Sequence, residues 1–107
     1  MAWVYLLVAA VFEVQWAVTM KYTEGFSRLW PSVACVAGMA VSIYFLALAQ
    51  RTLPVGTSYA VWTGLGAVGT AVCGIFLFNE SRETARLLCI LLIVAGVLGL
   101  KMVTKTA

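Results

Sequence analysis

The stretch WVYLLVAAVFEVQWAVTM, from Trp3 to Met20, is almost entirely apolar, and Glu13 is its only charged residue. A helix needs about 20 mostly apolar residues to cross the hydrocarbon core of a bilayer. The stretch therefore predicts a membrane-spanning helix. It also raises the question of why such a helix keeps a carboxylate near its middle.

The composition of the whole chain agrees with a membrane protein. Of its 107 residues, 64% are hydrophobic and 10% are charged, and the mean hydropathy is +1.03. A soluble domain carries about 25% charged residues. The seven basic residues occur singly between apolar runs, so they predict charges at the membrane surface and not a nucleic-acid-binding patch. We predict an integral membrane protein.

Four apolar runs are long enough to span a bilayer. They cover about residues 3–21, 31–49, 56–78 and 84–103, with short connections and a break at Leu53-Pro54. Pro31 suits the first turn of the second helix. Short connections place successive helices antiparallel. The predicted fold is an all-α membrane protein, with residues 1–107 forming a single four-helix transmembrane domain.

Basic residues are divided almost evenly between the two ends of this bundle. One end carries the N-terminal amine, Arg51, Lys101 and Lys105. The other carries Lys21, Arg28, Arg82 and Arg86. Because an excess of Lys and Arg on one side sets the orientation of a membrane protein, a near balance predicts insertion in both orientations. Dual topology permits an antiparallel homodimer, which supplies the inverted symmetry that many transporters obtain from internal repeats.

Small residues on the third and fourth helices predict close helix contacts. They are Gly64, Gly66, Gly69 and Gly74 on the third helix, and Ala95, Gly96 and Gly99 on the fourth. Packing within one chain and packing across a dimer are equally compatible with the pattern. Gly64 and Gly66 also lower helix propensity by about 1 kcal/mol each, which makes them candidates for a conformational hinge.

Glu13 is the strongest candidate for a functional residue. A charge at mid-bilayer costs about 2.5 to 3.5 kcal/mol on insertion scales, so such residues face a cavity or a partner. No lysine or arginine lies in the interior of any span, away from its ends, to neutralise Glu13. The other acidic residues, Glu24, Glu80 and Glu83, fall in the connections and are interpreted as ordinary interfacial charges.

Four further residues suit a site for an organic cation. Trp16 follows Glu13 by three residues, Tyr59 and Trp62 share a face of the third helix, and Ser42 is a hydroxyl central to the second span. Aromatic faces attract cations by about 0.5 to 2 kcal/mol each. We expect Ser42 and Tyr59 to hydrogen-bond the carboxylate.

The bilayer interior favours the neutral form of a carboxylic acid over the ionised form. Glu13 is therefore expected to hold a proton near neutral pH when no cation is bound. Proton and cation then compete for one group, which is sufficient for antiport if the site opens to one side at a time.

Two segments carry a resemblance to a known family. FEVQWAVTMKYTEGFSR (Phe12 to Arg28) and LPVGTSYAVWTGLGAVG (Leu53 to Gly69) resemble the small multidrug resistance family, and Trp16 with the WTGLG segment resembles its guanidinium-exporter subtype. The resemblance extends over nearly the whole chain. Two positions depart from it: Ala10, where relatives often carry glycine, and Gln15, where an apolar residue is more common.

The resemblance implies a four-helix protomer, an antiparallel dimer, and export of guanidinium driven by proton import across the bacterial inner membrane. Glu13 would be the shared proton and substrate carboxylate, and Gly64 and Gly66 the hinge of the third helix. The remaining binding positions would be Trp16, Ser42, Tyr59 and Trp62.

Two other functions remain open. One is a broader exporter of quaternary ammonium or alkylguanidinium cations, and the other is a structural membrane subunit without transport activity. An enzyme is a poor fit, because the sequence has no histidine, no Ser/His/Asp set and no phosphate-binding loop. We expect no cofactor and no metal.

Overall fold

A computed structural model describes residues 1–104 of the chain as four helices. They are α1 (Ala2–Tyr22), α2 (Leu29–Ala49), α3 (Val55–Leu77) and α4 (Thr84–Val103). All four are long and apolar enough to cross a membrane, as predicted. The largest difference in bounds is at α2, which begins at Leu29 instead of residue 31. Pro31 still lies in the first turn, where the backbone N–H that proline lacks would have no partner within the helix.

Local sequence explains the sharp turn between α1 and α2. Glu24, Gly25 and Phe26 all have positive φ, at 49°, 73° and 65°, in the left-handed region that residues other than glycine seldom adopt. The buried Thr23 holds this turn, because its hydroxyl donates to the Met20 carbonyl at 2.7 Å and accepts from the Phe26 N–H at 3.1 Å. The turn brings α2 back alongside α1.

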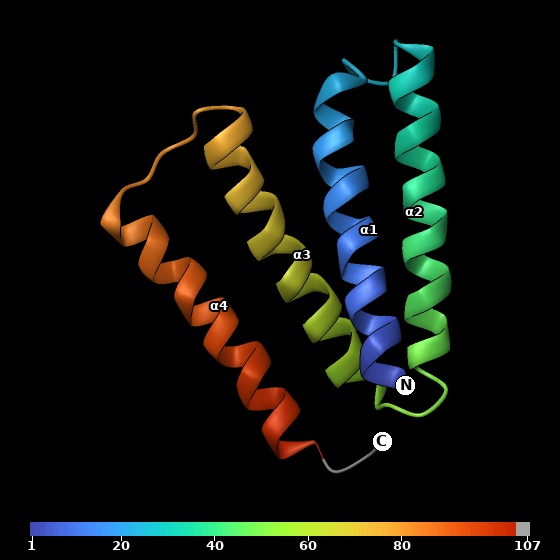
Figure 1. The fold of residues 1–107 in the computed structure, drawn as a ribbon, viewed down its shortest axis with the longest axis vertical. Coiled ribbons are helices and arrows are strands. Elements are labelled where there is room, and N and C mark those ends of the chain that lie inside the picture. The colour runs from blue at the N-terminus through green and yellow to red at the C-terminus, as the bar shows by residue number, and fades with distance from the viewer. Residues whose placement is uncertain (105–107) are drawn as a thin grey trace.

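The helices alternate in direction, and α1 lies between α2 and α3 (Figure 1). A buried cluster near the N-terminal end of α1 joins these three helices, including Leu6 of α1, Leu46 of α2 and Val61 of α3. The fourth helix packs along α3 and leans away from α2 (Figure 1). Its side chains reach α1 where the Lys101 ammonium lies 5.5 Å from the centre of the Trp3 ring.

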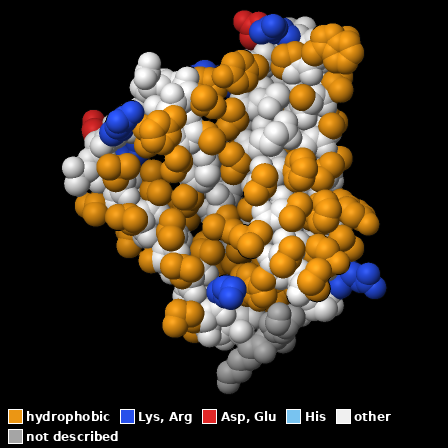
Figure 2. Space-filling view, viewed as in Figure 1, with side chains coloured by type: hydrophobic (Ala, Val, Ile, Leu, Met, Phe, Trp, Pro, Cys, Tyr) orange, Lys and Arg blue, Asp and Glu red, His pale blue; other side chains and the backbone are white. Residues whose placement is uncertain are grey.

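Charged side chains gather at the two ends of the helices, and apolar atoms cover most of the face between them (Figure 2). The N-terminus, the α2–α3 connection with Arg51 and the end of α4 with Lys101 lie together at one end (Figure 1). Both remaining connections, with Arg28 and Arg82, lie at the other end. Lys105, which we assigned to the first group, falls outside the described residues.

The glycines of α3 and α4 differ in what surrounds them. A Cβ added at Gly64 would meet Val97 of α4 at 2.9 Å, and one at Gly69 would overlap Val14 of α1. A Cβ at Gly96 or Gly99 would meet no atom of residues 1–104 within 4 Å. The glycines in the middle of α3, Gly64 and Gly69, are thus used for contacts within the chain, whereas Gly96 and Gly99 of α4 are open on the described protomer.

Candidate functional site

Glu13 lies in the middle of α1 and faces α3. Its carboxyl group sits directly on the backbone of Gly66, since a Cβ at that position would overlap all three carboxyl atoms. Glycine therefore makes room for the acid between two helices. Glu13 is partly buried, and its Oε2 atom is enclosed without a hydrogen-bond partner among the described residues. An enclosed oxygen of this kind is available to a proton or to a donor on a bound molecule.

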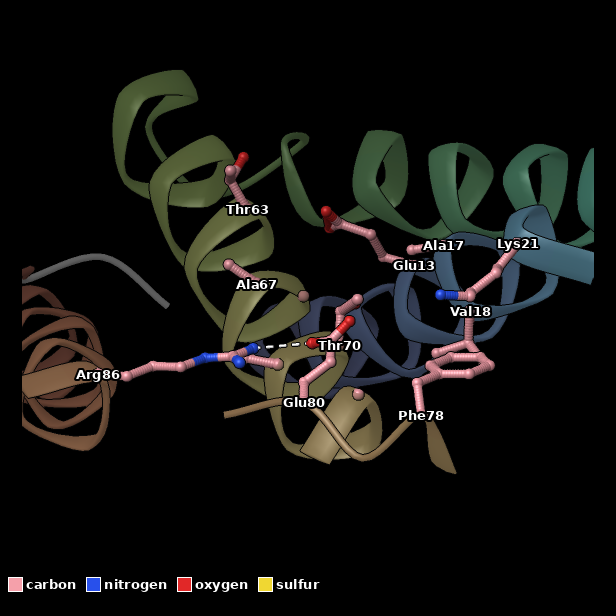
Figure 3. Close-up of a pocket in the computed structure, with 13 residues that line it drawn as sticks. Glu13, Ala17, Val18, Lys21, Thr63, Ala67, Thr70, Phe78, Glu80 and Arg86 are labelled. Carbon is pink, nitrogen blue, oxygen red and sulfur yellow. Dashed lines mark hydrogen bonds and ion pairs between the residues drawn. The ribbon is translucent and has the colours of Figure 1, made fainter. Parts of the chain in front are cut away.

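A groove of about 490 Å³ runs from Glu13 toward the charged α3–α4 connection (Figure 3). This volume is many times the ~30 Å³ that a water molecule occupies, so a small organic cation fits. The lining comes from α1, α3, the connection after α3, and α4: Glu13, Ala17, Val18, Lys21, Thr63, Gly66, Ala67, Thr70, Ala71, Gly74, Phe78, Glu80 and Arg86.

Ser42 and Trp62 form a second cluster, one helical turn from Glu13. The fully buried Ser42 hydroxyl donates to the Ala9 carbonyl at 2.6 Å and accepts from the Trp62 indole N–H at 2.8 Å. Ala9 lies four residues before Glu13 on α1, and Trp62 lies four residues before Gly66 on α3. Four residues of α-helix rise roughly 6 Å. Three helices are thus tied together beside the groove.

The hydrogen bond that we expected between Ser42 and Glu13 is not formed. The Ser42 donor is committed to Ala9, and the only proton that Ser42 offers is that of its hydroxyl. The Ala9 backbone carbonyl on α1 thus accepts the hydrogen bond that we had predicted for the Glu13 carboxylate. Ser42 contributes to the site by fixing Trp62 against α1.

The aromatic candidates are only partly brought together. Tyr59 and Trp62 form a tilted ring pair with centroids 5.6 Å apart, and Tyr59 is 55% exposed on the surface of the protomer. Trp16 is partly buried, and its indole N–H has no acceptor among residues 1–104. None of these three rings lines the groove that contains Glu13. Within a single protomer, the Glu13 carboxylate lines the groove and the three aromatic rings lie outside its lining.

Both glycines of the predicted hinge lie within one uninterrupted helix. α3 runs from Val55 to Leu77 without a break. Gly64 faces α4 and Gly66 faces the Glu13 carboxyl group. Their observed contribution is close packing on two sides of α3, and a bending motion at these glycines stays a prediction.

The two positions that depart from the family resemblance lie away from the groove. The amide of Gln15 donates to the Thr19 hydroxyl at 3.1 Å and to the Ala34 carbonyl at 3.3 Å, while its oxygen packs on Gly38 of α2. Ala10 is buried. Neither residue lines the groove. Gln15 therefore joins α1 to α2.

Sequence reasoning missed the charged residues at the far end of the groove. Glu80, which we interpreted as an ordinary interfacial charge, lines the groove and pairs with Arg86 at 2.8 Å. A signal for this was available in α3, where Gly66, Thr70 and Gly74 recur every four residues and mark a stripe of small side chains on one helix face.

The fold and the site define a small multi-spanning membrane protein with a carboxylate inside the membrane. The Small Multidrug Resistance protein family model matches residues 1–93. The chain belongs to this family.

Several relatives with high sequence identity are each named guanidinium exporter. A guanidinium exporter of Citrobacter freundii is 59% identical over 104 residues, which cover 97% of this chain and 99% of the relative. A guanidinium exporter of Salmonella typhimurium (strain LT2) is 56% identical over 102 residues, covering 95% and 97%. One from Yersinia pseudotuberculosis serotype I is 54% identical over 102 residues, covering 95% and 98%.

Proposed function

We propose that this protein exports guanidinium across the bacterial inner membrane in exchange for protons. The observation that carries the proposal is Glu13, which lies mid-helix and lines a groove. One of its carboxyl oxygens has no hydrogen-bond partner among residues 1–104. The relatives named guanidinium exporters, which match along nearly their whole length, support guanidinium as the cargo. Four membrane-length helices support a multi-pass membrane protein.

Competition at Glu13 couples the two ions. When Glu13 is ionised, guanidinium pairs with it through parallel N–H···O bonds, as an arginine side chain does with a carboxylate. When Glu13 is protonated, it no longer offers a negative charge to the cation. The groove next to Glu13 gives the cation access from the end of the molecule that carries the α3–α4 connection.

An antiparallel homodimer completes the transport cycle in this proposal. Every residue of α4 keeps part of its surface exposed, and Gly96 and Gly99 are open, which supports α4 as the face that a second protomer covers. The near-even charge at the two ends supports an inverted partner. Two Glu13 side chains then bring in two protons for each cation that leaves. One net charge enters per cycle, so an inside-negative potential of 100 mV adds about 2.3 kcal/mol to export.

The function is tested by solid-supported membrane electrophysiology on proteoliposomes of the purified protein. Adding guanidinium outside is expected to give a current opposite in sign to cation entry, because two protons leave for each cation that enters. The guanidinium concentration for half-maximal current should fall as pH rises, by at most about tenfold per pH unit for each competing proton.

Tetraalkylammonium serves as the comparison cargo in the same assay. A larger current with tetraalkylammonium than with guanidinium would indicate the broader exporter. A guanidinium current with the sign of simple cation entry, or one whose concentration dependence ignores pH, would contradict proton exchange.

Replacing Gly96 with leucine is expected to weaken the dimer without unfolding the protomer. A Cβ added at this position meets no atom of the described chain within 4 Å, so we expect the cost to fall on the partner's surface. Overpacking of a close contact costs about 1 to 3 kcal/mol, or about 5- to 150-fold in the dimer dissociation constant. Single-molecule photobleaching in liposomes at graded protein-to-lipid ratios measures this constant.

Gly56→Leu is the matched control for this variant. Gly56 lies in the first turn of α3, and a Cβ there also meets nothing within 4 Å among residues 1–104. It should leave the dimer unchanged. Equal dissociation constants for the Gly96 variant and the unmodified protein would remove α4 as the contact face.

A further inference from the structure

A second carboxylate lies at the outer end of the groove. Glu80 belongs to the connection after α3, and its carboxyl group rests on Gly74 of α3, where a Cβ would overlap it. The Glu80 backbone N–H donates to the Gly74 carbonyl at 3.2 Å, which fixes the start of this side chain against the helix. Glu80 is thus seated on a glycine just as Glu13 is seated on Gly66.

The two carboxylates mark the ends of one path. Gly66, Thr70 and Gly74 lie four residues apart on one face of α3, and all three line the groove together with both acids. Eight residues of α helix rise roughly 12 Å. On the α3 side, the groove between the two acids is thus lined by side chains no larger than threonine, which leaves room for a small cation.

The outer carboxylate already holds a guanidinium group, that of Arg86. An Arg86 nitrogen lies 2.8 Å from Glu80 Oε1 (Figure 3). Another Arg86 nitrogen donates to the Ser81 carbonyl at 3.1 Å. The pair is accessible, with 31% of the Arg86 side chain and 42% of the Glu80 side chain exposed. Exposed ion pairs of this kind are weak, so a free guanidinium ion can replace the tethered one.

Lys21, the other basic residue that lines the groove, contacts an aromatic ring. The Lys21 ammonium lies 4.6 Å from the centre of the Phe78 ring, which provides it with a cation–π contact. Among the described residues that line the groove, Glu80 and Glu13 are the acids, and Arg86 and Lys21 are the bases. Arg86 is the one paired with an acid.

Building on the proposed function, we propose that Glu80 is an outer binding site for the cargo and that Arg86 is its built-in competitor. Guanidinium displaces the Arg86 side chain from Glu80, and then moves along the small-residue path to Glu13. In an inverted dimer, each side of the membrane carries one such outer site.

The test compares Glu80→Gln and Arg86→Gln in proteoliposomes, with initial rates of guanidinium uptake measured over a range of concentrations. Loss of Glu80 is expected to raise the guanidinium KM about three- to tenfold at a nearly unchanged kcat. Loss of Arg86 should lower the KM about two- to fivefold, because an exposed ion pair no longer competes. Opposite directions for the two variants are the signature of the proposal.

A purely structural ion pair gives different results. If the pair only ties the connection to α4, both neutral variants change the KM in the same direction, and the exchanged pair Glu80→Arg/Arg86→Glu restores it. Either result would overturn the proposal. With a binding role, the exchanged pair stays impaired because the carboxylate has left its place on Gly74.

Two controls separate this proposal from other effects. Glu24→Gln and Arg28→Gln alter a pair with a 3.8 Å separation at the same end of the molecule but outside the groove lining. These two variants measure the general effect of surface charge on the local cation concentration. We expect that effect to be small, so both variants should leave the guanidinium KM unchanged. Failure of the unmodified protein to exchange guanidinium for protons would reject the proposed function itself. Unchanged KM values for both Glu80 and Arg86 variants, in a protein that transports, would reject the outer site alone.

Discussion

Glu13→Gln is expected to reduce guanidinium-coupled proton exchange to the level of protein-free liposomes. Glutamine keeps the size and helix propensity of the side chain, but it neither ionises nor releases a proton, so both ions lose their shared binding group. A charged hydrogen bond alone contributes about 1.5 to 3 kcal/mol, or about 10- to 150-fold in affinity. Uptake of guanidinium and release of protons are measured together in proteoliposomes.

Glu24→Gln is the control for loss of one acid, because Glu24 is exposed in the α1–α2 connection. It should keep the full exchange rate. Glu13→Asp should retain coupling at a lower rate, since it keeps the ionisable group but shortens its reach. If Glu13→Gln preserves the fold and the dimer but loses exchange, the structural-subunit hypothesis is rejected. Normal exchange by that variant would instead reject the mechanism proposed above.

The second large effect is expected from Gly66→Ala. The added methyl group would occupy the space now filled by the Glu13 carboxyl group, so the acid must move away from α3. Overpacking costs of about 1 to 3 kcal/mol correspond to a fall of about 5- to 150-fold in transport. Initial uptake rates measure this loss, and size-exclusion chromatography in detergent verifies that the protein is folded.

The matched control is Gly56→Ala in the first turn of the same helix, where an added Cβ meets nothing within 4 Å among the described residues. Both variants replace a glycine of α3 with alanine, a better helix former, so a loss of transport confined to Gly66→Ala reports the contact with Glu13. Equal rates for the two variants would show that the carboxylate does not depend on its place against Gly66.

The sequence was sufficient to predict the four helices, because each apolar run is close to the length that a bilayer requires. It was also sufficient to single out Glu13, since an acid in mid-span is costly and therefore rarely without a use. Both inferences need only the local sequence and the fact that the bilayer interior is apolar.

The lateral arrangement of the helices could not be predicted in the same way. Four apolar helices pack in lipid without a strong hydrophobic preference for one neighbour over another, so the outlying place of α4 was not evident. The Ser42 hydroxyl bonds the Ala9 carbonyl instead of the carboxylate, a choice set by which helix faces meet. Glu80 reaches the groove only because the connection after α3 folds back onto Gly74.

The fourth helix, which has no buried residue in the described protomer, has a consequence for the cell that makes the protein. In the dimer that we propose, one chain alone does nothing, and assembly requires an encounter between two copies in the plane of the membrane. When copies are scarce, output then grows with the square of their number per unit area. A modest rise in gene expression would therefore increase resistance to the cargo by a larger factor than the rise in expression itself.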